Sequence, residues 1–239
     1  MNFPISIRNL PPPWRVEVKW SACLGAGAFG LLCGAAVSAV FLKVFSPSAL
    51  VLGACFHIVA SVAALGGLWW VKPRGSLAAK LGIRRPAGAD VKAAVLGLLA
   101  VYGFIIAVVP LWRWVLDSLD VDYQETQELL EICAAADVPF FLYMLVLVGV
   151  VIPAAEELFF RRLLFGMLRP LGVVAALILT SVIFGALHGF LYGFWALTFF
   201  GAVLQWLYLR TGNLATGIIA HSVFNLVSLC VTFFLNGEE

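Results

Sequence analysis

Four polar side chains in the second half of this sequence have types and spacings that suit acid–base chemistry. His221 and Asn225 stand four residues apart, so both project from one face of a helix, and His188 follows Phe184 at the same spacing. Glu156 belongs to the run P-A-A-E-E-L-F-F-R-R, where charged groups interrupt an otherwise apolar stretch. One carboxylate, two imidazoles and one carboxamide are together the parts of a site that activates water for hydrolysis.

Each of these side chains could perform a defined task in such a site. A carboxylate in a dry pocket, here Glu156, can take a proton from water and return it to a leaving amine. The imidazoles of His188 and His221 could hold a divalent metal or donate hydrogen bonds to the developing oxyanion. Asn225 could also stabilise the oxyanion, or it could orient His221. The residue types alone leave these alternatives open.

The adjacent glutamates Glu156 and Glu157 are predicted to differ in role. Glu157 stands four residues before Arg161, and an acid that precedes a base at this spacing forms a favourable ion pair on a helix. We interpret that pair as structural. Glu156 points about 100° away around the helix and has no basic residue at the same spacing. Because an ionisable group at membrane depth normally has a partner or a function, Glu156 is the candidate for the chemistry.

The composition predicts that membrane-spanning helices position these residues. Of the 239 residues, 63% are hydrophobic and only 12% are charged, whereas soluble domains have a charged share of about 25%. A spanning helix needs roughly 20 mostly apolar residues. On that criterion the sequence predicts an all-α polytopic membrane bundle with about seven transmembrane helices, at residues 20–42, 49–71, 91–116, 139–168, 172–189, 194–210 and 214–235.

The same pattern predicts one main domain. We expect a cytoplasmic N-terminal segment at residues 1–19, a single transmembrane domain at 20–235 and a tail at 236–239. The residues that could do chemistry all fall in the motif core of that domain, at 139–229.

The lengths of the predicted helices limit which residues can meet. Glu156 lies 14 residues before Pro170 and His188 lies 18 residues after it, so at about 1.5 Å per residue their depths differ by only about 6 Å. We therefore expect these two side chains to meet. Straight vertical helices would leave His221 well below His188, unless the turn at Gly189 to Gly193 lets the sixth helix tilt.

The charged residues between the predicted helices indicate the orientation of the chain. The loop after the second predicted helix is basic, and the loop after the third is acidic. By the positive-inside rule the basic loop and the N-terminus lie inside, and we expect the bacterial cytoplasmic membrane. The acidic stretch 120–137 could form an amphipathic helix or a solvated loop. The net charge of +2 is too small to indicate a nucleic acid partner; the expected surroundings are the lipid bilayer.

Three short motifs, each in a predicted helix, resemble those of a known family. They are Glu156-Glu157-x-x-x-Arg161, Phe184-x-x-x-His188 and His221-x-x-x-Asn225. A proline shortly before the glutamates and the run L-x-x-R-T-G-N-L before the last motif add to the likeness. On these residues the sequence resembles the CPBP family of intramembrane proteases, which includes CAAX prenyl endopeptidases and bacteriocin self-immunity proteins.

The resemblance implies a role for each motif residue. The implied catalytic residues are Glu156, His188, His221 and Asn225, supported by Glu157, Arg161 and Phe184. Glu156 would activate water, Asn225 would support the oxyanion, and the histidines would assist catalysis or, with Glu156, bind a metal such as zinc. The sequence has no H-E-x-x-H motif, and a metal-free glutamate protease fits the same residues, so the cofactor is either a divalent metal or none.

The predicted function is therefore that of an intramembrane endopeptidase. It would hydrolyse a peptide bond of a membrane-associated protein, at a CAAX-like or other C-terminal tail. The alternative is a non-catalytic membrane adaptor or bacteriocin self-immunity protein with the same fold. A proton-coupled transporter ranks third, because the sequence lacks the repeated halves that such proteins often have. The identity of the substrate and the oligomeric state stay open.

Overall fold

The computed structural model describes residues 82–236 and the isolated positions 25, 29, 30, 32–34, 36 and 62. Within these residues the chain consists of helices and loops without strands, in agreement with the predicted all-α class. Apart from the isolated positions, the first two predicted helices, at 20–42 and 49–71, lie outside the described residues. The segments 1–19 and 237–239 also lie outside them.

Three helical stretches of the described part are long and apolar enough to cross a membrane. They are α4 (Gly88–Ser118), the continuous stretch Val138–Leu171 and α11 (Leu214–Asn236). α9 (Val173–Leu187) is apolar but shorter, and α10 (Phe194–Thr211) does not meet the same criterion. The apolar helices indicate an integral membrane protein, but the predicted count of about seven spanning helices is not confirmed.

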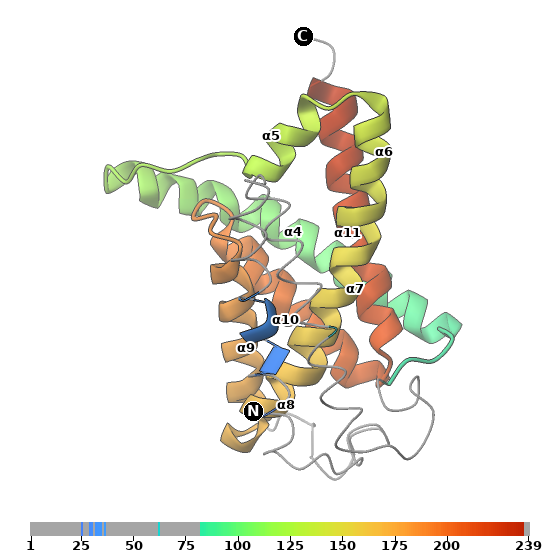
Figure 1. The fold of residues 1–239 in the computed structure, drawn as a ribbon. Coiled ribbons are helices and arrows are strands. Elements are labelled where there is room, and N and C mark those ends of the chain that lie inside the picture. Colours follow the sequence, from blue (N-terminus) through green and yellow to red (C-terminus); the bar gives the residue numbers. More distant parts are fainter. Residues whose placement is uncertain are drawn as a thin grey trace.

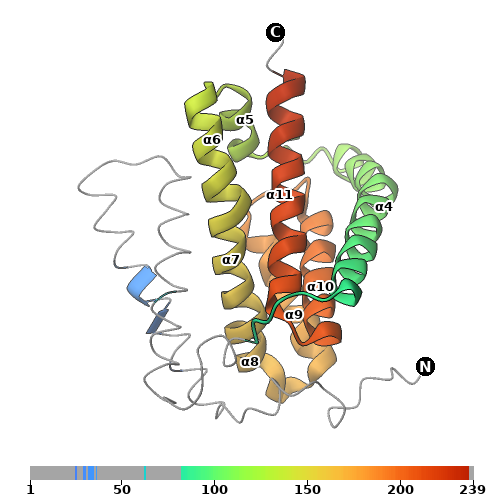
Figure 2. The ribbon, with the colours of Figure 1, turned by 90° about the vertical axis from the view of Figure 1, so that its right-hand side faces the viewer.

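The helices form a bundle in which two long elements run side by side and a shorter hairpin packs against them. The stretch 138–171 and α11 are neighbours over most of their length, and α9 and α10 form the hairpin (Figures 1 and 2). α4 packs at a slant against α10 and α11, on the side of α11 that faces away from the stretch 138–171 (Figure 2). The polar residues of the second half therefore lie inside this group of helices.

The turns of the bundle lie at different heights, and this corrects the expected depth of His221. The turn between α10 and α11 lies above the turn between α8 (Phe165–Leu168) and α9, and α9 ends partway along α11 (Figures 1 and 2). His221, early in α11, therefore reaches Glu156 and Glu157, its ring nitrogens lying 3.6 and 3.1 Å from their carboxylate oxygens. The assumption of straight vertical helices, which would leave His221 well below His188, does not hold, because α10 does not descend to the level of the preceding turn.

The stretch 138–171, where the sequence predicted a spanning helix at 139–168, contains two π-helical segments. Its successive elements are α6 (Val138–Val146), η3 (Leu147–Val151), α7 (Ile152–Glu157), η4 (Leu158–Leu164), α8 and the 3₁₀ turn η5 (Arg169–Leu171). The π segments η3 and η4 flank α7, the short element that carries both glutamates. π-helical turns of this kind occur frequently at functional sites.

The acidic stretch 120–137 combines the two predicted alternatives. Residues 119–127 form a loop, and α5 (Glu128–Ala134) is a short helix that packs against α11. Cys133 of α5 is fully buried, and Leu129 packs against the same apolar cluster, while Glu128 and Glu131 are exposed. α5 is thus an amphipathic helix, whereas the residues before it form the loop.

At the opposite end of the bundle, Asn213 joins the segment before α4 to the start of α11. Its Oδ1 accepts hydrogen bonds from the backbone N–H groups of Arg84 at 3.1 Å and Ala215 at 3.2 Å, and its side chain is fully buried. The guanidinium of Arg84 also forms a two-pronged ion pair with Asp90, at 2.7 and 2.9 Å. We call these contacts of Asn213, Arg84 and Asp90 the clamp. The clamp fixes the start of α11 against the segment before α4.

We predict that Asn213→Ala destabilises the protein, because two backbone N–H groups lose their acceptor. A buried donor without a partner costs about 1–3 kcal/mol, so the free energy of unfolding should fall by roughly 2 kcal/mol or more. Thermal unfolding of the purified protein in detergent measures the loss. Arg85→Ala, at an exposed neighbouring position, is the control, and equal melting temperatures for the two variants would contradict the clamp.

Candidate active site

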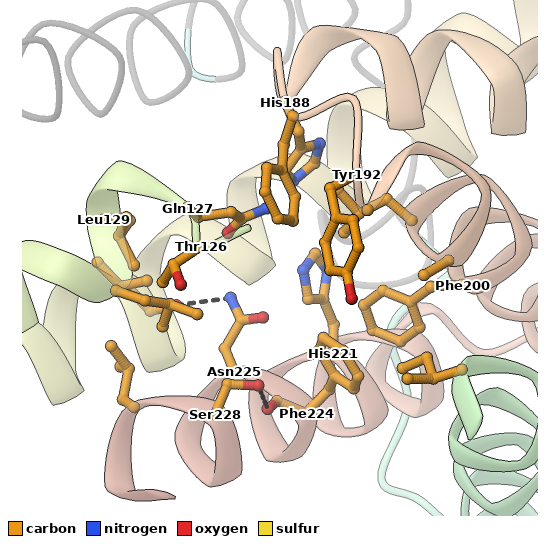
Figure 3. Close-up of a pocket in the computed structure, with 18 of the residues that line it drawn as sticks. Thr126, Gln127, Leu129, His188, Tyr192, Phe200, His221, Phe224, Asn225 and Ser228 are labelled. Atoms are coloured by element: carbon orange, nitrogen blue, oxygen red, sulfur yellow. Dashed lines mark hydrogen bonds between the residues drawn. The ribbon is translucent and has the colours of Figure 1, made fainter. Parts of the chain in front are cut away.

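A pocket of about 540 Å³ lies between α11, the α9–α10 hairpin, α4 and the acidic loop (Figure 3). The four predicted catalytic residues, Glu156, His188, His221 and Asn225, all contribute to its lining. Much of the remaining wall is apolar, and Phe200 of α10 and Phe224 of α11 form part of it. The tertiary structure thus gathers side chains from three separate motifs around one cavity.

His221 lies between two carboxylates of the neighbouring helix. Its Nδ1 is 3.1 Å from Oε1 of Glu157, and its Nε2 is 3.6 Å from Oε2 of Glu156. An ionised carboxylate only accepts hydrogen bonds, so Nδ1–H donates to Glu157, and the neutral ring then presents the lone pair of Nε2 to Glu156. The exposed surface is 2% for His221, 5% for Glu156 and 0% for Glu157. Nε2 and Glu156 thus lie side by side at the pocket wall, at a separation slightly longer than a hydrogen bond.

The predicted ion pair between Glu157 and Arg161 is confirmed. Nε of Arg161 lies 3.1 Å from Oε2 of Glu157, and neither side chain has exposed surface. The terminal guanidinium nitrogens have no hydrogen-bond partner among the described residues, and the group lies over the rings of Phe160 and Phe184, 5.6 and 5.1 Å from their centroids. Cation–π attraction therefore helps to hold the buried charge.

Phe184 and His188 form the part of the site that comes from α9. The buried ring of Phe184 lies 4.7 Å from the ring of His188 and 5.8 Å from the ring of His221, between centroids. Nδ1 of His188 is 2.7 Å from the backbone oxygen of Phe184. Because a carbonyl oxygen only accepts, Nδ1 carries the proton, and Nε2 of the neutral ring remains an acceptor.

Asn225 fills a gap that a proline leaves in the neighbouring helix. At the end of η3 the N–H of Ile152 bonds to the carbonyl of Leu147, five residues earlier. The next donor in this pattern would be residue 153, but Pro153 has no N–H, so the carbonyl of Val148 lacks a helical partner. Nδ2 of Asn225 donates to that carbonyl at 2.9 Å. One amide hydrogen and Oδ1 of Asn225 remain for the pocket.

The acidic loop is held against the turn between α9 and α10. The rings of Tyr123 and Tyr192 stack with centroids 5.5 Å apart. The hydroxyl of Tyr123 donates to Asp117 at 2.6 Å, which raises the pKa of Tyr123 above its usual value. Arg113, near the end of α4, forms an ion pair with Glu125 of the loop at 2.6 Å. These contacts place residues 125–127 in the wall of the pocket.

The structure changes two expectations about the glutamates and adds residues that the sequence did not predict. Glu156 lies beside His221 of α11, a neighbour that the spacing along its own helix did not indicate. Glu157, interpreted as structural, also holds His221. The pocket further contains Thr126 and Gln127, for which the only sequence signal was the mixture of acidic and apolar residues in 120–137. That pattern left an amphipathic helix and a solvated loop as alternatives, and it did not show what the segment covers.

The candidate metal ligands Glu156, His188 and His221 do not form a metal site in this arrangement. Within the described part of the chain, no three His, Cys, Asp or Glu side chains are grouped so that they could hold a metal ion. In addition, Nδ1 of His221 is bonded to Glu157, and Nε2 faces a second carboxylate. The residues therefore do not fit a resident zinc ion.

The fold and the site define a class of protein: an integral membrane helical domain with a buried glutamate–histidine site beside a largely apolar pocket. Residues 138–227 match the family model described as type II CAAX prenyl endopeptidase Rce1-like, and this range contains all three motifs. This match agrees with the resemblance to the CAAX protease and bacteriocin-processing (CPBP) family that the motifs indicate.

One curated protein is similar to part of the chain. The UPF0177 protein YxdF of Lactococcus lactis subsp. lactis (strain IL1403) is 31% identical over 94 residues, which cover 37% of this chain and 52% of the relative. The chain thus spans about half the length of that relative, whose name states no activity. No solved structure matches the chain.

We predict that Glu157→Gln strongly destabilises the protein, because it leaves the guanidinium of Arg161 buried without a counter-charge. Breaking a buried pair from one side costs about 3–5 kcal/mol. The double variant Glu157→Gln/Arg161→Met removes both charges and should be more stable than Glu157→Gln alone. Thermal unfolding of the variants and of Arg161→Met gives the coupling energy, and simple additivity of the single losses would argue against the pair.

A second prediction concerns Asn225 and the proline opposite it. Asn225→Ala should lower the melting temperature, because the carbonyl of Val148 loses its donor. In a Pro153→Ala background, the backbone N–H of the new alanine can donate to that carbonyl, so Asn225→Ala should cost less there. Thermal unfolding of the four proteins of this cycle measures the difference. An equal cost in both backgrounds would show that the proline is not the reason for the bond.

Proposed function

We propose that this protein is an intramembrane endopeptidase in which Glu156 activates water to hydrolyse a peptide bond of a membrane-associated protein. The observation that carries the proposal is the position of Glu156 beside Nε2 of His221, in a pocket where Nδ1 of that ring is held by Glu157. The match to the Rce1-like family supports a protease of the CAAX type. The geometry of the described residues favours a glutamate-type reaction over one that uses a three-ligand metal site.

The proposed reaction assigns a step to each group. Glu156 takes a proton from a water molecule while the water oxygen bonds to the carbonyl carbon, whose double-bond electrons move to its oxygen. The remaining N–H of Asn225 donates to that oxyanion, and Nε2 of His188 accepts a hydrogen bond from the water. The oxyanion then collapses, the C–N bond breaks, and the proton passes from Glu156 to the leaving nitrogen. Nε2 of His221, beside Glu156, can share the proton that Glu156 takes from the water.

The location of the pocket bears on the side from which a substrate arrives. Its wall includes residues 125–127, 129 and 130 of the acidic loop and α5. The basic residues Arg84, just before α4, and Arg169, just after α8, belong to the other end of the bundle, where these elements begin and end (Figure 1). If the basic end is cytoplasmic, as the positive-inside rule predicts, the pocket lies nearer the outer face of the membrane. We therefore propose a substrate whose CAAX-like or other C-terminal tail reaches that outer half.

The alternative is a non-catalytic adaptor or self-immunity protein. One observation favours it: Asn225 and Glu157 both form bonds that hold helices together, so the motifs could serve folding alone. Cleavage by the unchanged protein and by the variant Glu156→Gln, described next, separates the two functions.

We predict that Glu156→Gln lowers the cleavage rate by at least about 100-fold, because the amide cannot accept a proton from water. The assay uses protein in phospholipid vesicles with two probes, a farnesylated peptide that ends in a CAAX sequence and the same peptide without the lipid. Mass spectrometry detects the product. Glu131→Gln, a matched change on the surface of α5, is the control. Cleavage that survives in Glu156→Gln at normal abundance would exclude this mechanism, whereas no cleavage by the unchanged protein would favour the adaptor function.

A further inference from the structure

A second pocket of about 260 Å³ adjoins the candidate active site. Gln127, Leu129, His188 and Phe190 line both cavities, so a single layer of side chains lies between them. His188, one of the predicted catalytic residues, stands in this layer. A peptide chain that occupied both pockets would therefore pass directly over His188.

Gln127 stands in the same layer on a fixed backbone. Its carbonyl accepts hydrogen bonds from the N–H groups of Leu130 at 2.8 Å and Glu131 at 3.1 Å, at the start of α5. Figure 3 shows Gln127 on the same side of the pocket as His188. Within the described residues no hydrogen bond involves its side chain. A carboxamide offers both donors and an acceptor, as a peptide group does, so Gln127 is suited to bind the main chain of a peptide.

The second pocket carries a negative charge that no cation in the described part of the chain neutralises. Its lining includes the exposed carboxylate of Glu128, and its other residues there are uncharged or, in the case of His188, shared with the active site. The nearby acid Glu125 differs, because it is paired with Arg113. A cationic side chain placed in this pocket gains an attraction, and an anionic one meets a repulsion.

We propose that the second pocket is a substrate subsite. It binds the side chain of the residue next to the apolar segment that contains the scissile bond. Gln127 holds the peptide main chain where it passes from one pocket to the other, and Glu128 selects lysine or arginine over aspartate or glutamate. The apolar part of the substrate occupies the larger pocket. The inference rests on the proposed function, because it takes the scissile bond to lie at Glu156 and His188.

The test compares Glu128→Lys with Glu131→Lys. Both variants make the same charge change in the first turn of α5, but Glu131 lines neither pocket. The probes are peptides with an apolar leucine–valine stretch that is preceded or followed by one lysine, glutamine or glutamate. Binding is measured in phosphatidylcholine vesicles with each variant in a Glu156→Gln background, so it does not depend on turnover.

The peptides form two sets, one with the variable residue before the apolar stretch and one with it after. With glutamate at position 128, we expect that in one of these sets the lysine peptide binds about five-fold more tightly than the glutamate peptide. Glu128→Lys should reverse that order, Glu131→Lys should not, and Gln127→Ala should weaken all three peptides by a similar factor. An unchanged order in Glu128→Lys, or an equal reversal in Glu131→Lys, would overturn the subsite.

The outcome separates this inference from the proposed function. If charge-selective binding occurs but the protein with Glu156 intact cleaves no probe, the subsite stands and the proposed function fails. If cleavage occurs without the effect at Glu128, the proposed function stands and the subsite is wrong.

Discussion

The site depends on one buried carboxylate, that of Glu157, which binds both a guanidinium and an imidazole. Oε2 accepts from Arg161 of the same helix, and Oε1 accepts from His221 of α11. Removing an acid and a guanidinium from water costs several kcal/mol for each ion, so the pair is stable only if both groups are well partnered. α11 can approach closely because residue 217 is glycine: a Cβ there would lie 2.7 Å from Oε2 of Glu157. The carboxylate therefore sets the position of α11 against α7.

A second contact joins the same two helices at a higher level. Asn225 lies one turn beyond His221 and donates to the carbonyl of Val148, which Pro153 leaves without a helical donor. A carbonyl that lacks a donor in its own helix is thus hydrogen-bonded by a polar side chain of the neighbouring helix. With contacts at two levels, α11 has little freedom to slide or rotate, and His221 is held beside Glu156. Such fixed geometry is what acid–base and oxyanion chemistry require.

The two sides of the pocket have different origins, and this bears on specificity. The residues proposed for the chemistry come from α7, from the end of α9 and from α11, all within the range 138–227 that matches the family model. The loop 119–127 and α5 form the other side and lie outside that range. Gln127 and Glu128 belong to this second part. Under the proposed function, one wall carries the reaction and the other contacts the substrate.

The sequence by itself determined the features that are local to one helix. The spacing of four between Glu157 and Arg161 predicted an ion pair, and the same spacing placed His221 and Asn225 on one face, because helical periodicity is a property of a short segment. Composition likewise indicated a membrane protein. Only the tertiary structure decided the height of the α10–α11 turn and the partners of Glu156 and Asn225. These depend on how separate helices pack, and no pattern within a single helix records the vertical position of its neighbour.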